Sequence, residues 1–120
     1  MDLLASNADG SRSIAVQVKA SCTAWEGRTK QKEKSHWTFM MSTSDIQKRD
    51  SALIYVFVSL RDRLIDAADY FIMPGDIVSK RLEEEFHLHP RKSEIRMLNI
   101  FEHEKTSFHD RWDIIEKALA

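Results

Sequence analysis

The chain has little of what disulfide-linked, membrane-spanning and phosphate-loop proteins are built from. Its single cysteine, Cys22, cannot form an internal disulfide, and three glycines are too few for a glycine-rich phosphate loop. No apolar run is long enough to cross a bilayer, and no basic start followed by an apolar stretch indicates a signal peptide. These absences favour a protein of the reducing cytoplasm, with no membrane partner and with Cys22 as a small, partly buried residue.

The chain also lacks an excess of positive charge. A formal net charge of −1 gives no overall attraction to nucleic acid, so DNA binding would need a local basic patch. One segment offers such a patch, and its basic residues are Arg28, Lys30, Lys32 and Lys34. These side chains could follow a phosphate backbone, and Trp25 or Trp37 could stack on a base. The commoner alternative is a solvated loop beside tryptophans that belong to the core.

The most informative pattern is the alternation over residues 14–19. Ile14, Val16 and Val18 share one face of a strand, and Ala15, Gln17 and Lys19 share the other. The polar face carries an amide and an ammonium roughly 7 Å apart along the strand.

A turn-forming run over residues 6–10 separates this strand, predicted over 12–20, from a shorter one over 2–5. The two are predicted to pair as a hairpin. That pairing would bring the Asp2 carboxylate near Gln17 and Lys19.

The middle of the chain predicts further strands and one helix. Strands are expected over 36–41, 52–60 and 69–73, with a polar loop over 23–35, a turn or cap at 43–45 and a charged turn over 61–67. The run over 52–60 is apolar throughout and predicts a central strand covered on both faces. Asp76 is expected to begin a helix with Arg81 beside Glu84 or Glu85. Its predicted apolar stripe is Ile77, Val78, Leu82 and Phe86.

The last part of the chain is compatible with more than one arrangement of secondary structure. Pro90 should close the helical unit, and residues 94–101 are compatible with a strand or a helix. A final helix is expected from His109 or Asp110 to Leu119. Its inward residues would be Trp112, Ile115 and Leu119. The whole chain, residues 1–120, is predicted to be a single domain around one core.

Asp2 followed by Gln17-Val18-Lys19, with the later strands in this order, resembles the PD-(D/E)XK nuclease superfamily. The resemblance extends over Tyr55–Leu60, Tyr70–Pro74 and Trp112–Ile115. It implies an α/β, restriction-endonuclease-like fold, with a mixed central sheet flanked by helices. The family's first helix precedes its aspartate, whereas Asp2 follows Met1 here, so we expect an N-terminally truncated version of this fold.

The resemblance also implies a site. Asp2, Gln17 and Lys19 would be catalytic, with Asp2 and Gln17 holding Mg²⁺ or Mn²⁺ and Lys19 assisting the attacking water. The substrate would be DNA. Gln17 is neutral where the family commonly has an acid, and one carboxylate binds a hard cation less tightly than two.

Two functions therefore stay open. One is a metal-dependent nuclease-like domain that acts on DNA phosphodiesters. The other is a non-catalytic interaction or nucleic-acid-binding module on the same fold, expected to be a homodimer because a missing helix would expose apolar sheet surface. The histidines, including His87 and His89, lack cysteine or acidic partners at zinc spacing and predict no metal site.

Overall fold

The structure, a computed structural model, describes residues 2–31, 34–42, 53–61, 64–88 and 95–120. These residues form a mixed α/β fold with two β-sheets and four short or medium helical segments. The predicted turn at 43–45 and the stop at Pro90 lie outside the described residues. None of the described helices combines the length and the apolar character that a bilayer crossing needs.

The larger sheet contains four strands in the order β1-β2-β5-β6. β2 pairs antiparallel with β1 and parallel with β5, and β6 pairs antiparallel with β5, so the sheet is mixed. This agrees with the predicted mixed central sheet. Its strands are β1 (Asp2–Ser6), β2 (Ser13–Ser21), β5 (Leu53–Arg61) and β6 (Leu64–Pro74).

A second, antiparallel sheet was not foreseen. Its strands lie in the order β3-β4-β7, and two of them come from the chain segment that connects β2 to β5. The ambiguous region near residue 100 is a strand and belongs to this sheet. The strands are β3 (Trp25–Glu26), β4 (His36–Ser42) and β7 (Ile95–Phe101).

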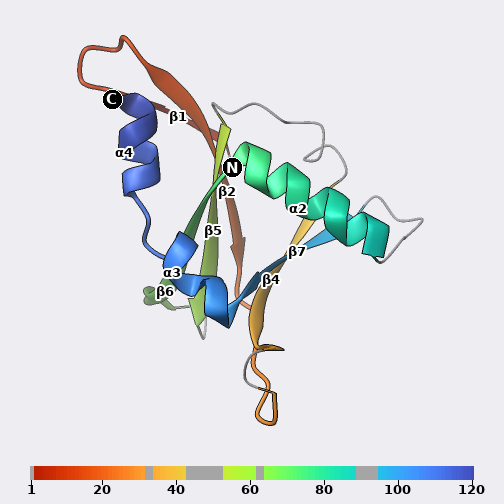
Figure 1. Cartoon of the computed structure of the whole chain (residues 1–120). Helices are drawn as coiled ribbons and strands as arrows, with labels where there is room; N and C mark the ends of the chain where they lie inside the picture. Colours follow the sequence, from red (N-terminus) through yellow and green to blue (C-terminus); the bar gives the residue numbers. More distant parts are fainter. Residues whose placement is uncertain (1, 32–33, 43–52, 62–63, 89–94) are drawn as a thin grey trace.

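The helices lie on opposite sides of the larger sheet (Figure 1). Helix α4 lines one side, whereas α2 lies on the other, next to the smaller sheet. Two further short turns of helix connect β7 to α4. The helical segments are α2 (Gly75–Leu88), η2 (Glu102–Glu104), α3 (Lys105–Phe108) and α4 (Asp113–Leu119).

The larger sheet is buried on both faces. One core lies between the two sheets and α2, and its largest side chains are completely buried. The other core lies between the opposite face of the larger sheet and α4. β5 contributes Tyr55 and Phe57 to the first core and Ile54, Val56 and Val58 to the second. This confirms β5 as a central strand covered on both faces.

Several local predictions are wrong. The strand β6 begins at Leu64, so most of the expected charged turn is strand instead. Cys22 is exposed rather than partly buried. In α2, Phe86 is 37% exposed because the last residues of this helix extend beyond the inter-sheet core. Its ring packs under the guanidinium of Arg96, 4.5 Å from the ring centre.

The C-terminal helix begins later than predicted. Asp110 has a φ of 53°, in the left-handed region, which interrupts the helical backbone between α3 and α4. Ile115 and Leu119 pack on the core as expected. Trp112 is 42% exposed, and its ring contacts only the edge of that core, at Tyr70.

The β1–β2 turn uses glycine for a conformational reason. Gly10 has a φ of +72°, and its N–H donates to the Asn7 carbonyl at 3.1 Å. An added Cβ would meet nothing within 4 Å. We expect Gly10→Ala to lower the free energy of unfolding by about 1 kcal/mol, from backbone strain alone. Urea unfolding measures this, and Gly10→Asn should cost less because asparagine tolerates this conformation. Equal stability of wild type and Gly10→Ala would contradict the explanation.

Candidate functional site

The hairpin predicted from the sequence is present in the backbone. Asp2 lies directly opposite Gln17, and the pairing continues in register to Ser6 opposite Ser13. Directly opposite residues of an antiparallel pair share a face of the sheet. The Asp2 side chain itself lies outside the described part of the structure, so its predicted role stays a prediction.

The predicted alternation of β2 is also present. Ile14 and Val16 are buried in the core under α4, and Val18 packs against it. Gln17 and Lys19 are therefore on the opposite face, where their parallel neighbours on β5 are Tyr55 and Phe57. Gln17 is 8% exposed, and Lys19 is half-buried.

This location affects the electrostatics of the two polar side chains. Both Tyr55 and Phe57 are completely buried, so the amide and the ammonium lie at the border of an aromatic core. A low local dielectric strengthens the interaction of such groups with a bound anion or cation. The position of Gln17 and Lys19 beside buried aromatic rings is therefore suited to binding a charged ligand with little screening by solvent.

Lys19 borders a cavity of about 460 Å³, which we call the lysine cavity. The hydroxyl-bearing residues Ser21, Thr23 and Thr38 line it, together with the carboxylate-bearing Glu26 from β3. Met40, which is 64% exposed, forms part of its apolar border. A lysine and several hydroxyls around one hollow are donors of the kind that bind phosphate oxygens.

Glu26 is a residue of this site that the sequence did not indicate. The sequence placed it in a solvated basic loop, whereas the structure places it on β3, paired with His36 of β4. Its carboxylate lies 3.6 Å from Nη2 of Arg28 and 3.5 Å from Nε2 of His36. Glu26 thus links the lysine cavity to the basic segment. Only the non-local pairing of β3 with β4 could have signalled this.

The basic segment lies at the surface. Arg28, Lys30 and Lys34 are exposed, while Lys32 lies outside the described residues. The segment follows β3 and leads into β4, and in Figure 1 it extends away from the body of the fold at the lower end. Arg28 is 51% exposed, so solvent screens its ion pair with Glu26 and leaves the guanidinium available for other anions.

The two tryptophans named with this segment differ in environment. Trp37 is 2% exposed and belongs to the inter-sheet core, as the commoner alternative predicted. Trp25 is 45% exposed, and its ring lies 4.5 Å from that of Trp37. Of these two, only Trp25 is accessible to a ligand.

The donors predicted for a cation are oxygens. They are the carboxylate of Asp2 and the side-chain amide of Gln17, and oxygen ligands are those that Mg²⁺ and Mn²⁺ prefer. By donor type the predicted pair therefore fits these ions. Among the residues that the structure describes, no group of three His, Cys, Asp or Glu side chains is arranged to hold a metal.

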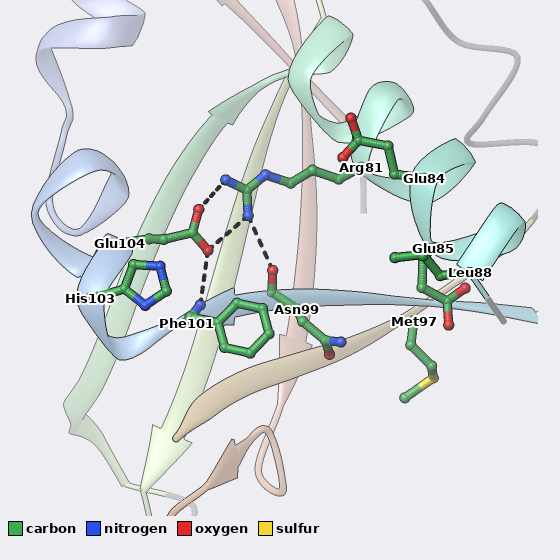
Figure 2. A pocket seen from close by; sticks show the side chains of 9 residues that line it. All are labelled: Arg81, Glu84, Glu85, Leu88, Met97, Asn99, Phe101, His103 and Glu104. Carbon is green, nitrogen blue, oxygen red and sulfur yellow. Dashed lines mark hydrogen bonds and ion pairs between the residues drawn. The ribbon is translucent and has the colours of Figure 1, made fainter. Parts of the chain in front are cut away.

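A second cavity, of about 480 Å³, lies between α2 and β7 (Figure 2). Arg81 and Glu104 form an ion pair there, with side chains 25% and 20% exposed. Arg81 also donates to the Asn99 carbonyl at 3.3 Å, and the Phe101 N–H donates to Glu104 Oε1 at 3.1 Å. The expected pairing of Arg81 with a glutamate of its own helix is thus wrong, because the side chain turns toward β7 and η2.

The pair around Glu104 stabilises the fold and is satisfied internally. Burial alone would raise the pKa of Glu104, but hydrogen bonds from Arg81 and from the Phe101 N–H lower the pKa below its ordinary value. Arg81 also lies over the ring of Phe108, 5.0 Å from its centre. These contacts join α2, β7 and α3, and they assign this cavity a structural role.

A third polar cluster joins β5, β6 and the segment before α4. The buried Asp69 accepts from Arg61 Nη2 at 2.9 Å and lies 3.0 Å from His109 Nε2. The other ring nitrogen of His109 lies 3.3 Å from Asp110. Because both ring nitrogens lie near carboxylates, His109 links β6 to the C-terminal segment.

Comparison with known proteins adds no assignment. No protein-family model, no curated protein and no solved structure matches the chain.

Proposed function

We propose that this chain is a metal-dependent nuclease-like domain that acts on DNA phosphodiesters. The observation that carries the proposal is the register of the hairpin, with Asp2 opposite Gln17 and Lys19 two residues further along β2. An acid, a second oxygen donor and a lysine at these positions are what the PD-(D/E)XK resemblance requires. The lysine cavity, which Lys19 borders, has room and donors for a phosphate.

The proposal includes the fold family. A hairpin followed by a parallel neighbour in a mixed sheet, with a helix along one face, supports a restriction-endonuclease-like arrangement. The departure is the connection from β2 to β5, which contains β3 and β4 of the second sheet.

Each residue has a role in this proposal. Asp2 and Gln17 would hold Mg²⁺ or Mn²⁺, which polarises a phosphate and lowers the pKa of a bound water when present. Lys19 stabilises the negative charge that develops on the phosphate oxygens during attack. Arg28, Lys30, Lys32 and Lys34 would contact the DNA backbone.

The main test is a plasmid-nicking assay with Mg²⁺ or Mn²⁺. We expect wild type to nick the plasmid and Lys19→Ala to lower the rate by about a hundredfold, because one charge-stabilising donor is lost. Lys117→Ala is the matched control, since this lysine is 77% exposed on α4, which packs on the face of the larger sheet opposite to Lys19. Equal rates for wild type and Lys19→Ala would exclude Lys19 from catalysis.

A second test concerns Gln17, the uncharged member of the predicted cation site. Gln17→Glu restores a second carboxylate at the predicted cation site, and hard cations bind more tightly to anionic oxygens. We therefore expect the Mg²⁺ concentration for half-maximal nicking to fall. A titration of nicking rate against Mg²⁺ measures the change. An unchanged or higher midpoint, in a variant that unfolds like wild type, would contradict a cation at Gln17.

The alternative is a non-catalytic module that forms a homodimer. The observation that favours it is the pair of exposed leucines on the edge strand β1, with Leu3 51% and Leu4 74% exposed. In the described part of the chain β1 has a strand neighbour on one side only, and exposed apolar residues on such an edge are suited to contact with a second copy. Light scattering that gives a monomer mass at all concentrations would count against it. The exposed Cys22 suits a reducing cytoplasm in either case.

A further inference from the structure

The surface around Trp25 forms a second hollow next to the candidate site. This cavity, which we call the tryptophan cavity, has a volume of about 460 Å³. That volume lies within the usual range for small-molecule and cofactor sites. Its lining residues are Trp25, Gly27, Arg28, Thr29, Ser35 and Glu102.

The indole of Trp25 is held in place from two directions. Its ring contacts that of Trp37, with centroids 4.5 Å apart, and Trp37 is itself buried at 2% exposure. The backbone of Gly27 also lies close, because an added Cβ there would be 3.2 Å from Trp25 Nε1. An aromatic ring that is supported by the core and still 45% exposed can stack on a flat ligand with little loss of conformational entropy.

The charges around the tryptophan cavity suit a nucleotide. Arg28 borders it, with a side chain that is half exposed. The backbone N–H of Arg28 donates to Oγ of the buried Ser35 at 2.8 Å, which holds the loop against the residue just before β4. The exposed Lys30 and Lys34 follow within the same segment. Glu102 offers a carboxylate that can accept from the N–H groups of a base edge.

Consecutive residues of β3 border the tryptophan cavity and the lysine cavity, which share no lining residue. Glu26 borders the lysine cavity, and its neighbour Trp25 borders the tryptophan cavity. Glu26 also pairs with Arg28 at 3.6 Å.

We propose that Trp25 is the stacking platform for an unpaired base of single-stranded DNA, with Arg28 contacting the adjacent phosphate. Bases inside a duplex are stacked on one another and cannot stack on the indole, so the site selects single-stranded segments. The inference rests on the proposed function for its choice of DNA, but it concerns binding and not cleavage.

The test is fluorescence anisotropy with a short, fluorescein-labelled single-stranded DNA of mixed sequence, in EDTA so that no cleavage occurs. We expect Trp25→Leu to weaken binding about tenfold, because one base–indole stack is lost. Trp112→Leu is the matched control, since Trp112 is 42% exposed but lies beside Tyr70, and it should bind as wild type does. Trp25→Phe keeps an aromatic face and should retain most of the affinity.

Salt dependence tests the role of Arg28 separately. On single strands each phosphate contact contributes about 0.7 to the slope of log affinity against log salt, so Arg28→Gln should lower the slope by about 0.7. Wild type should bind the labelled duplex of the same sequence more weakly than the single strand. The affinity for the duplex should not change in Trp25→Leu.

The outcomes distinguish this inference from the proposed function. Wild type that fails to bind the single strand, or Trp25→Leu that folds and binds as tightly as wild type, would overturn the inference. If the protein binds the single strand through Trp25 but nicking is absent or insensitive to Lys19→Ala, the stacking role of Trp25 is kept and the proposed nuclease function is rejected.

Discussion

Replacing Phe57 by alanine is expected to lower the free energy of unfolding by about 3–5 kcal/mol. Phe57 is completely buried between the two sheets, and its ring lies 5.0 Å from that of Phe39 on β4 and 5.7 Å from that of Tyr55. Removing it leaves a cavity at the contact that joins the sheets. Such a loss is a large part of the roughly 5–15 kcal/mol that stabilises a domain of ordinary size.

Urea unfolding followed by circular dichroism measures the effect. Leu88→Ala is the control, because Leu88 is 75% exposed at the end of α2 and its loss should change stability by no more than about 0.5 kcal/mol. If the two variants had the same urea midpoint, the packing of β5 against β4 would not be the main contact between the sheets.

The second large effect concerns Glu104. We expect Glu104→Gln to lower the free energy of unfolding by about 1.5–3 kcal/mol at pH 7, because the variant loses the charge in its hydrogen bonds to Arg81 and the Phe101 N–H. The deficit should shrink in acid. Hydrogen bonds outweigh the effect of burial and hold the pKa of Glu104 below the ordinary 4.5, so the wild-type carboxylate contributes its full stability above pH 4.5. That contribution is lost as the pH falls through the folded-state pKa.

The measurement is urea unfolding of wild type and Glu104→Gln at a series of pH values from neutral to acid. Glu116→Gln, at an exposed position of α4, is the control and should follow wild type throughout. A deficit that is independent of pH would mean that the carboxylate charge of Glu104 does not stabilise the fold.

The strands could be predicted because their side-chain pattern is local. The alternation over Ile14–Lys19 predicted β2, and the apolar run after residue 52 predicted β5 as a central strand. The pairing of Asp2 with Gln17 followed from a short turn between two strands, which leaves few alternatives.

The division into two sheets could not be predicted in this way. Alternation shows which residues share a face of a strand, but not which strand lies beside it. β4 pairs with β7, so Trp37 lies opposite Ile100. These two residues are far apart in the sequence, and no local pattern predicts that they pair. The same limit applied to Arg81, whose partner is 23 residues away rather than on the next turn of α2.

Only some of the residues around the candidate site could be named from the sequence. Gln17 and Lys19 could be named as candidates because they lie on the polar face of β2, and their predicted role stays a prediction. Glu26 was not found, because its place beside the lysine cavity depends on β3, a strand of two residues. Trp25 and Trp37 are cross-strand partners, and only burial distinguishes the exposed ring from the core ring.

The hydrogen bonds of Arg81 and Glu104 also bear on how the protein resists aggregation. In the described part of the chain β7 has a strand neighbour, β4, on one side only, and strands with a free edge tend to recruit strands of other molecules. Arg81 donates to the Asn99 carbonyl, and Glu104 accepts from the Phe101 N–H. A strand from another molecule would otherwise form hydrogen bonds with these two backbone groups. The side chains of this ion pair, which joins α2 to η2, therefore occupy backbone groups at the edge of β7 and disfavour pairing of the smaller sheet with that of a second molecule.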